Sequence, residues 1–400
     1  MSERKVTYYT PQTDYEYKAV YCTDVVEFCP YQGLENYFVI GTYEVLESGG
    51  NVISEVANDL SNDNEDENED EIEDENTENN DEDDENSIKR TGRLLFQNLE
   101  PVKDDSNKKK IKIHNVLNLN TAAIFDLKWS YQKINDNGYL GMADAVGDVT
   151  VYKLNTNGKI YDLTKVANTE NTTNELCCSL DWSNRISSSI NNMVVSRSNG
   201  YITLYDFNNS EIKQLDHWEG HKFEAWVASF DQWNPNIIYS GADDCLFKGW
   251  DKRATSAPTF VNKKHDAGVC CIQVNPHNEH IMATGSYDTY LNIWDKRNMV
   301  KPLIHYCTEG GVWKIKWHPK LEKKNYIAAA CMYNGFHIFD IDYNSVGENA
   351  ITEICSYDKH ESIAYGVDWC QYNNDTCKNQ MLGTCSFYDH LFHIWEMEPI

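Results

Sequence analysis

One pattern recurs along the second half of this sequence and limits the folds open to it: an aspartate stands six residues before a tryptophan. It occurs at Asp244 and Trp250, at Asp288 and Trp294, and at Asp389 and Trp395. The first two tryptophans are 44 residues apart, and both are followed by Asp-Lys-Arg. Weaker copies end at Tyr152, Tyr205 and Phe339, so the anchors follow one another at intervals of 44 to 56 residues. A period of this length indicates a fold built from repeated structural units.

A second pattern marks the start of each repeat. Seven segments alternate in polarity and end in a bulky residue, at 25–28, 125–129, 178–182, 226–230, 270–274, 313–317 and 365–369. Alternation with a period of two predicts a strand. A repeat of this length that ends in Trp-Asp resembles the WD-repeat family, in which each repeat supplies four strands of one propeller blade. We therefore predict an all-β protein, a single seven-bladed WD40 β-propeller over residues 1–400.

The last predicted blade lacks an outer strand. The sequence ends on the third strand of that blade, at Ile394 and Trp395. Val6–Tyr9 is a short run of β-prone residues near the other end of the chain. We predict that this run pairs with the last blade, which removes an open sheet edge.

An acidic segment interrupts the first predicted blade. The net charge is −28, and Ser61–Asn86 holds 16 Asp and Glu residues and no Lys or Arg. Such a segment cannot bury enough apolar surface to offset the entropy of ordering it. We predict a disordered acidic insertion at 58–88, which is either a solvated spacer or an electrostatic docking segment. The acidity argues against a nucleic-acid partner, because phosphates are bound by Lys and Arg.

The sequence also indicates a compartment. Met1–Thr10 lacks the apolar core of a signal peptide, and no run approaches the roughly 18 apolar residues that span a bilayer. The 13 cysteines form no Cys-x-x-Cys pair, and Cys177-Cys178 and Cys270-Cys271 are adjacent pairs. We therefore predict a reduced, cytoplasmic protein with no membrane association and no bound metal. A propeller completes its own core, so we expect a monomer.

Three sets of polar residues recur with the repeats. They are His221, Ser240, Asp244 and Trp250; His265, Thr284, Asp288 and Trp294; and His360, Thr384, Asp389 and Trp395. Each set could be mistaken for a hydrolase triad, but catalysis needs such a set only once. Three copies favour structural hydrogen-bond networks that rigidify the blades, which is how the WD-repeat family uses this set.

Longer segments carry a closer resemblance. They include Gly-His-Lys-Phe-Glu-Ala-Trp at 220–226, Gly-Gly-Val-Trp-Lys-Ile-Lys-Trp-His-Pro at 310–319 and Thr-Cys-Ser-Phe-Tyr-Asp-His at 384–390. With these segments the sequence resembles the diphthine methylesterase family, WD-repeat proteins of the diphthamide pathway that are also called diphthine methyltransferases. The resemblance is strongest over Trp218–Glu396.

The resemblance implies a reaction and a partner. Members of the family remove the methyl ester from a modified histidine of eukaryotic elongation factor two, which gives diphthine. The substrate side chain bears an ester and a quaternary ammonium group. The resemblance implies an ester hydrolase that needs no cofactor, and it supplies no catalytic residues. Motifs of other enzyme classes, such as G-x-S-x-G and H-E-x-x-H, are absent. The alternative is a non-catalytic adaptor that recruits a modifying enzyme to the elongation factor or scaffolds another complex.

The repeat geometry predicts where a substrate binds. Propeller ligands commonly sit at the mouth of the central channel, where the innermost strands begin. The residues at this position that we predict to bind substrate are Asp24, Phe125, Trp226, Trp313 and Tyr365. Aromatic faces attract a quaternary ammonium group by about 2 kcal/mol when desolvated. The alternative is that these rings only pack between blades.

Ester hydrolysis also needs a base or a nucleophile, and a group that stabilises the oxyanion. We predict Glu224 or His390 as the base and Tyr388 as the oxyanion donor, with His360 as a further candidate base. The alternative is a covalent route through Cys178 or Cys270.

Overall fold

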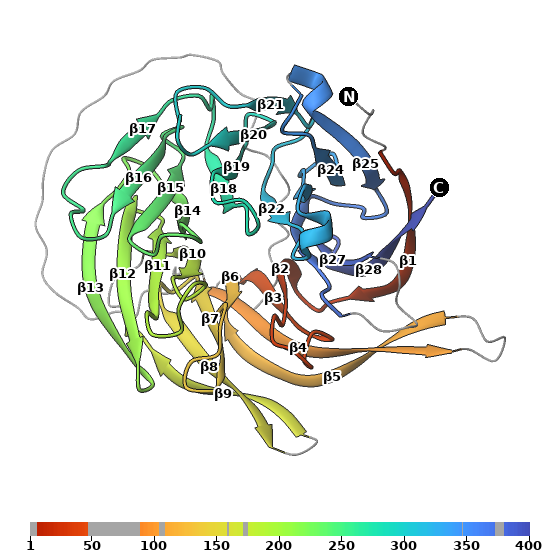
Figure 1. The fold of residues 1–400 in the computed structure, drawn as a ribbon. Helices are drawn as coiled ribbons and strands as arrows, with labels where there is room; N and C mark the ends of the chain where they lie inside the picture. Colours follow the sequence, from red (N-terminus) through yellow and green to blue (C-terminus); the bar gives the residue numbers. More distant parts are fainter. Residues whose placement is uncertain are drawn as a thin grey trace, which may run out of the picture.

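The computed structural model describes residues 6–46, 89–103, 109–157, 160–170, 175–345, 347–372 and 380–400. Within these ranges the strands form seven four-stranded antiparallel sheets. The sheets stand as blades around a central channel (Figure 1). The predicted seven-bladed β-propeller is therefore confirmed.

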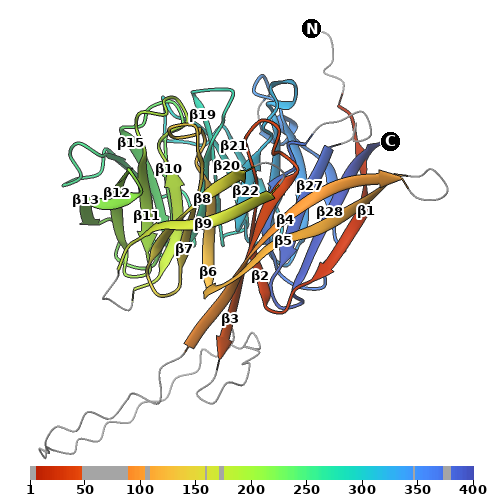
Figure 2. The same cartoon turned by 90° about the horizontal axis from the view of Figure 1, so that it is seen from below.

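The first three blades follow the N-terminal strand β1 (Tyr9–Lys18). Blade 1 consists of β2 (Cys22–Phe28), β3 (Tyr37–Leu46), β4 (Lys89–Lys103) and β5 (Lys109–Ala122). Blade 2 consists of β6 (Ile124–Trp129), β7 (Gly138–Asp144), β8 (Val149–Asn157) and β9 (Ile160–Asn168). Blade 3 consists of β10 (Cys177–Trp182), β11 (Asn192–Arg197), β12 (Tyr201–Asn208) and β13 (Glu211–Glu219). In each blade the first strand is innermost and the last is outermost, and the β4–β5 hairpin extends beyond the disc (Figure 2).

The remaining blades follow in chain order. Blade 4 consists of β14 (Ala225–Phe230), β15 (Ile237–Ala242), β16 (Phe247–Asp251) and β17 (Phe260–Asn262). Blade 5 consists of β18 (Val269–Val274), β19 (Ile281–Ser286), β20 (Tyr290–Asp295) and β21 (Ile304–Cys307). Blade 6 consists of β22 (Lys314–Trp317), β23 (Tyr326–Ala330), β24 (Phe336–Ile341) and β25 (Ile351–Tyr357), with short 3₁₀ turns at Leu321–Lys323 and Gly347–Ala350. Blade 7 consists of β26 (Ala364–Trp369), β27 (Gln380–Ser386), β28 (Leu391–Pro399) and β1.

The N-terminal strand closes the ring. β1 pairs antiparallel with β28, from Tyr9 opposite Pro399 to Lys18 opposite Leu391. The start of β1 and the end of β28 therefore lie side by side at the outer edge of blade 7 (Figure 1). The source of the closing strand agrees with the sequence, but the predicted bounds of Val6–Tyr9 were wrong, because only Tyr9 belongs to the strand. β1 extends to Lys18 although its sequence is largely polar, because Tyr15 and Tyr17 pack against the hydrophobic cluster that blades 7 and 1 share.

The bulky residues that close the innermost strands join neighbouring blades. The indole N–H of Trp182 donates to the carbonyl of Lys128 in the preceding blade at 3.0 Å, and that of Trp369 donates to the carbonyl of Lys316 at 2.9 Å. The core thus lies between the blades, and the alternating side chains of an innermost strand pack on both neighbours.

The predicted acidic insertion at 58–88 lies outside the described residues. The described parts that flank it are β3 and β4, which pair within blade 1. The twelve cysteines of the described ranges are all free thiols. Among the described residues, no helix is long and apolar enough to cross a membrane.

Candidate functional site

A cavity of about 390 Å³ opens at the end of the channel where the innermost strands begin. We call it the mouth cavity. Its lining combines aromatic and polar side chains: Cys22, Asp24, Tyr43, Glu44, Val45, Phe125, Trp226, Tyr287, Trp313, Tyr365, Phe387, Tyr388 and His390. All five residues predicted to bind substrate are among them. Tyr388 and His390, two of the predicted catalytic residues, also line the cavity.

β-bulges explain why these positions face the cavity. In six blades the pairing register shifts at one residue near the start of the innermost strand, namely Asp24, Phe125, Cys178, Trp226, Cys270 and Tyr365. The equivalent residue of blade 6, Trp313, lies immediately before β22. A bulge re-aims one side chain out of the regular alternation. The repeat therefore presents one side chain per blade to the channel, and all of these except Cys178 and Cys270 line the mouth cavity.

The aromatic side chains form a continuous wall. The Trp313 ring lies 5.7 Å from the Trp226 ring, 5.7 Å from the Tyr287 ring and 4.7 Å from the Tyr365 ring, centroid to centroid. The wall continues from Tyr365 to Phe387 at 5.0 Å.

It then passes from Phe387 to Tyr43 at 5.7 Å and from Tyr43 to Phe125 at 5.4 Å. The sequence prediction missed Tyr43, Tyr287 and Phe387. Tyr287 and Phe387 lie just after the end of the second strand of their blades, and Tyr43 lies in β3 opposite Cys22, the first residue of β2. All three are on the face where the innermost strands begin. Applying the repeat register to that strand end would have found them.

Asp24 is the most perturbed acid of the mouth cavity. Its side chain is buried, and among the described residues no donor forms a hydrogen bond with its carboxyl group. Burial raises the pKa of Asp24, the charge of nearby Lys314 opposes this rise and the charge of nearby Asp126 adds to it, so that the pKa is about 8. A buried acid with a raised pKa in a cavity is a typical mark of a functional site.

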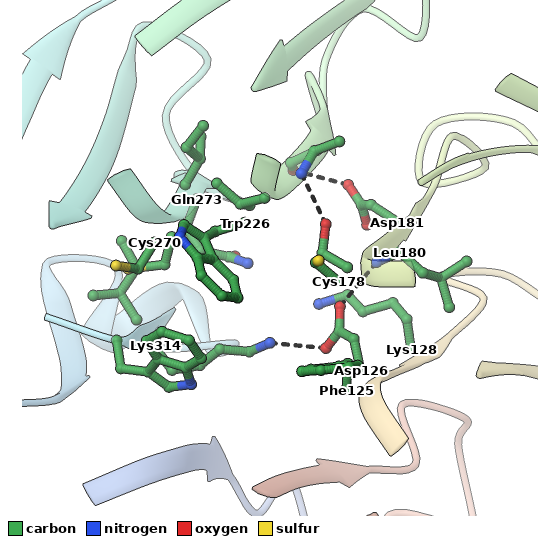
Figure 3. A pocket seen from close by; sticks show the side chains of 18 residues that line it. Phe125, Asp126, Lys128, Cys178, Leu180, Asp181, Trp226, Cys270, Gln273 and Lys314 are labelled. Atoms are coloured by element: carbon green, nitrogen blue, oxygen red, sulfur yellow. Dashed lines mark hydrogen bonds and ion pairs between the residues drawn. The ribbon is translucent and has the colours of Figure 1, made fainter. Parts of the chain in front are cut away.

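Charged side chains fill the channel beyond the mouth cavity. The Lys314 ammonium group donates to Asp126 at 2.8 Å, and the other oxygen of Asp126 accepts the backbone N–H of Leu180 at 3.0 Å (Figure 3). The channel narrows here to a pocket of about 60 Å³. Further along, Lys316 pairs with Glu27. The ion pair with Asp126 holds Lys314 in this narrow part of the channel.

Cys178 and Cys270 line this narrow part of the channel, where burial raises the pKa of both thiols. Their environment therefore disfavours the thiolate that a covalent route needs.

His390 contacts a thiol at the edge of the mouth cavity. Its Nε2 lies 3.6 Å from the Cys22 sulfur, and its Nδ1 lies 3.2 Å from the carbonyl oxygen of Val20. The carbonyl can only accept, so Nδ1 carries the proton and Nε2 is left as the acceptor. The Cys22 sulfur also lies 3.9 Å from the Oε2 atom of Glu44. Burial is the larger cause and the negative charge of Glu44 the second cause that raise the pKa of the Cys22 thiol to about 12. This pKa disfavours the thiolate that a nucleophile or a metal site requires.

The remaining predicted catalytic residue lies apart. Glu224 is exposed, immediately before β14, and does not line the mouth cavity. Tyr388 is 42% exposed, and its backbone N–H donates to Ser362. The structure thus brings Tyr388 and His390 together with Asp24 and leaves Glu224 outside the cavity.

The three recurrent polar sets are hydrogen-bonded networks inside their blades. His221 lies 2.9 Å from Asp244 and 2.7 Å from Ser240, whose oxygen accepts the indole N–H of Trp250 at 2.8 Å. His265, Asp288, Thr284 and Trp294 repeat this arrangement.

The set in blade 7 differs. His360 contacts Thr384 at 2.9 Å, but it reaches Asp389 through Ser386, and the indole nitrogen of Trp395 has no hydrogen-bond partner within the described ranges. Because His360 lies in this network and does not line the mouth cavity, it is poorly placed to act on a substrate there.

Comparison with known proteins finds relatives that are named as diphthine methyltransferases. No family model matches the chain. A diphthine methyltransferase of Homo sapiens is 34% identical over 365 residues, which cover 86% of this chain and 72% of that protein. A diphthine methyltransferase homolog of Dictyostelium discoideum is 32% identical over 401 residues, which cover 94% of this chain and 96% of that protein.

A solved structure supports the fold. A chain in a crystal structure of the mitotic checkpoint complex matches with a TM-score of 0.62 over 96% of this chain and 95% of that chain, at 14% identity. At that identity the match supports the propeller fold alone.

Proposed function

The chain belongs to the diphthine methyltransferase family, and from that premise we propose that it is an ester hydrolase of diphthamide biosynthesis. The proposed substrate is methylated diphthine on eukaryotic elongation factor two. Water replaces the methoxy group of its ester, so that the products are diphthine and methanol. The reaction needs no bound cofactor.

The observation that carries this proposal is the aromatic wall of the mouth cavity beside a buried acid. The substrate bears a quaternary ammonium group on the carbon next to the ester carbonyl. Aromatic faces such as Trp226, Trp313 and Tyr365 attract this cation, and the negative charge of ionised Asp24 adds to the attraction. A cavity that holds the ammonium group therefore holds the ester carbonyl within reach of the same side chains.

Two of the predicted catalytic residues remain well placed. The Nε2 atom of His390 can accept a proton, and the Tyr388 hydroxyl can donate to an oxyanion at the edge of the cavity. Glu224 is exposed outside the cavity, so its replacement by alanine should leave methanol release unchanged.

The protein substrate is proposed to dock on the face onto which the mouth cavity opens. Large apolar side chains on this face are exposed: Val20 (61%), Val146 (49%), Phe223 (60%), Tyr333 (75%) and Tyr388 (42%). They lie in loops that precede innermost strands or follow second strands, so they surround the opening. Exposed apolar side chains gathered around a binding site are typical of a protein-interaction surface. The twelve free thiols accord with a cytoplasmic place of action.

The test uses the purified chain and elongation factor two that carries the methylated ester. Mass spectrometry follows the modified histidine peptide, and methanol release is measured in parallel. We expect the loss of one methylene unit per modified histidine, with many turnovers per enzyme molecule.

Each of the other possible results would contradict the proposal and support a different function. Tight binding without a mass change would support the adaptor alternative. A gain of one methylene unit in the presence of a methyl donor would support methyl transfer in the literal sense of the relatives' name. Neither binding nor turnover would leave a propeller of another function.

A further inference from the structure

We propose that Asp24 is the general base that delivers water to the ester carbonyl, and that the ammonium group of the bound substrate converts Asp24 into its active, ionised form. This inference rests on the proposed function. It assigns one catalytic residue and explains how the site can distinguish an ester that carries a cation from one that does not.

The geometry of Asp24 supports the first part. Asp24 occupies the β-bulge of blade 1, so its side chain faces the cavity instead of following the strand alternation. It is only 6% exposed, and no described donor occupies its carboxyl group. Both carboxyl oxygens are therefore available to a water molecule or a substrate. Phe125 and Tyr365, the bulge residues of the two neighbouring blades, stand on either side of it in the ring.

The charges around Asp24 support the second part. Lys314 and Asp126 face it from blades 6 and 2 as an ion pair, and their charges act on the pKa of Asp24 in opposite directions. The other titratable groups that line the cavity or interact with Asp24 are Cys22, Tyr43, Glu44, Tyr287, Tyr365, Cys385, Tyr388 and His390. Because burial keeps the pKa of Asp24 near 8, only about a tenth of the free enzyme is ionised at pH 7. A quaternary cation in the cavity favours the charged carboxylate and lowers that pKa.

The step balances with water as the only co-reactant. Asp24 takes a proton from water while the water oxygen bonds to the ester carbonyl carbon and the carbonyl electron pair moves to its oxygen. The tetrahedral intermediate then expels the methoxy group, which takes the proton from Asp24 and leaves as methanol. The product acid loses its proton to solvent. Its carboxylate now faces the carboxylate of Asp24, and this like-charge repulsion favours product release.

Cys22 is the competing group in the same cavity. A covalent route would need its thiolate, but the buried thiol lies beside the carboxylate of Glu44. A neutral thiol is a poor nucleophile, whereas a carboxylate needs only a water molecule. Of these two groups, Asp24 is therefore the one that the environment favours.

The experiment compares Asp24→Asn and Asp24→Glu with the full-length wild-type protein on the elongation-factor substrate. Glu361→Gln is the matched control, because Glu361 is an exposed acid on the same face that does not line the cavity. We expect Asp24→Asn to lower kcat by about 10²-fold or more, the usual contribution of a general base.

The pH profile separates catalysis from a structural role. Wild-type kcat/KM, which reports the free enzyme, should rise with pH and level off above about 8. The profile of kcat should level off at a lower pH, because the bound cation has already ionised Asp24. A neutral isostere of the substrate, with carbon in place of the ammonium nitrogen, should not show this separation. Asp24→Glu should keep part of the activity and the rising limb, which makes the test informative even if Asp24→Asn unfolds.

The failure of this inference is distinguishable from that of the proposed function. No turnover by the wild type would refute the proposed function itself. Wild-type turnover with a fully active Asp24→Asn variant would refute only the role of Asp24. Loss of activity in Cys22→Ala, together with a trapped thioester on Cys22 in the wild type, would also overturn it, whereas an active Cys22→Ala variant supports the water route.

Discussion

Replacing Trp313 with leucine tests the cation-binding role of the aromatic wall. Trp313 contacts Trp226, Tyr287 and Tyr365, so it is the centre of the wall, and its side chain is half-buried, so that a cation bound against it in the cavity loses much of its water. A cation on such a face gains about 2 kcal/mol. At 1.36 kcal/mol for each factor of ten, we expect kcat/KM to fall by about 30-fold for the ammonium ester. Leucine keeps an apolar side chain at the position and removes the aromatic face.

The assay measures methanol release from two small methyl esters that are equal in shape. One carries the trimethylammonium group, and the other carries a tert-butyl group in its place. Only the ratio of the two kcat/KM values is used, because a partly unfolded variant lowers both values equally. The predicted result is that Trp313→Leu reduces the preference for the ammonium ester by about 30-fold. An equal loss for both esters would show that the ring only packs between blades, and the reasoning would be refuted.

Three further predictions concern stability and docking. Deleting residues 1–18 removes the strand opposite β28 and should lower the melting temperature sharply, whereas deleting 1–5 should not; equal melting temperatures would contradict the closure. Burial lowers the pKa of His318 from 6.5 to about 4. Between these pH values the unfolded chain therefore binds a proton that the folded protein does not bind. The free energy of unfolding should therefore fall by about 3 kcal/mol from this residue as the pH falls from about 6.5 to 4. Denaturant unfolding of His318→Gln should show a shallower fall of this free energy with pH, and an unchanged slope would exclude this role. Phe223→Ser and Tyr333→Ser should raise KM for the elongation factor by about tenfold and leave a small ester unaffected, and a change with both substrates would argue against a docking surface.

The repeat pattern was sufficient to predict the architecture. The Asp-to-Trp spacing and the seven alternating segments are local features, because in every blade except the seventh the four strands follow one another in the sequence. The same register placed Asp24, Phe125, Trp226, Trp313 and Tyr365 at the start of the innermost strands. These five residues share one cavity because each blade repeats the same geometry around one axis.

The rest of the site depends on contacts between blades that exist only in the closed ring. Tyr43, Tyr287 and Phe387 join the aromatic wall from blades that are far apart in the sequence, and Glu224 is left outside although it is two residues from Trp226. The environment of Asp24 depends on Lys314 and Asp126, which approach it from two other blades.

Local pattern and distant contacts therefore governed different properties of this protein. Alternation along a strand determines which face a side chain takes, so the sequence by itself could determine the blades. The repeat register then marked one position at the start of each innermost strand. The pKa of a buried acid depends on desolvation and on charges brought near by closure of the ring, and neither is encoded by neighbouring residues. The same holds for the N-terminal strand, whose bounds follow from its packing against β28 and blade 1.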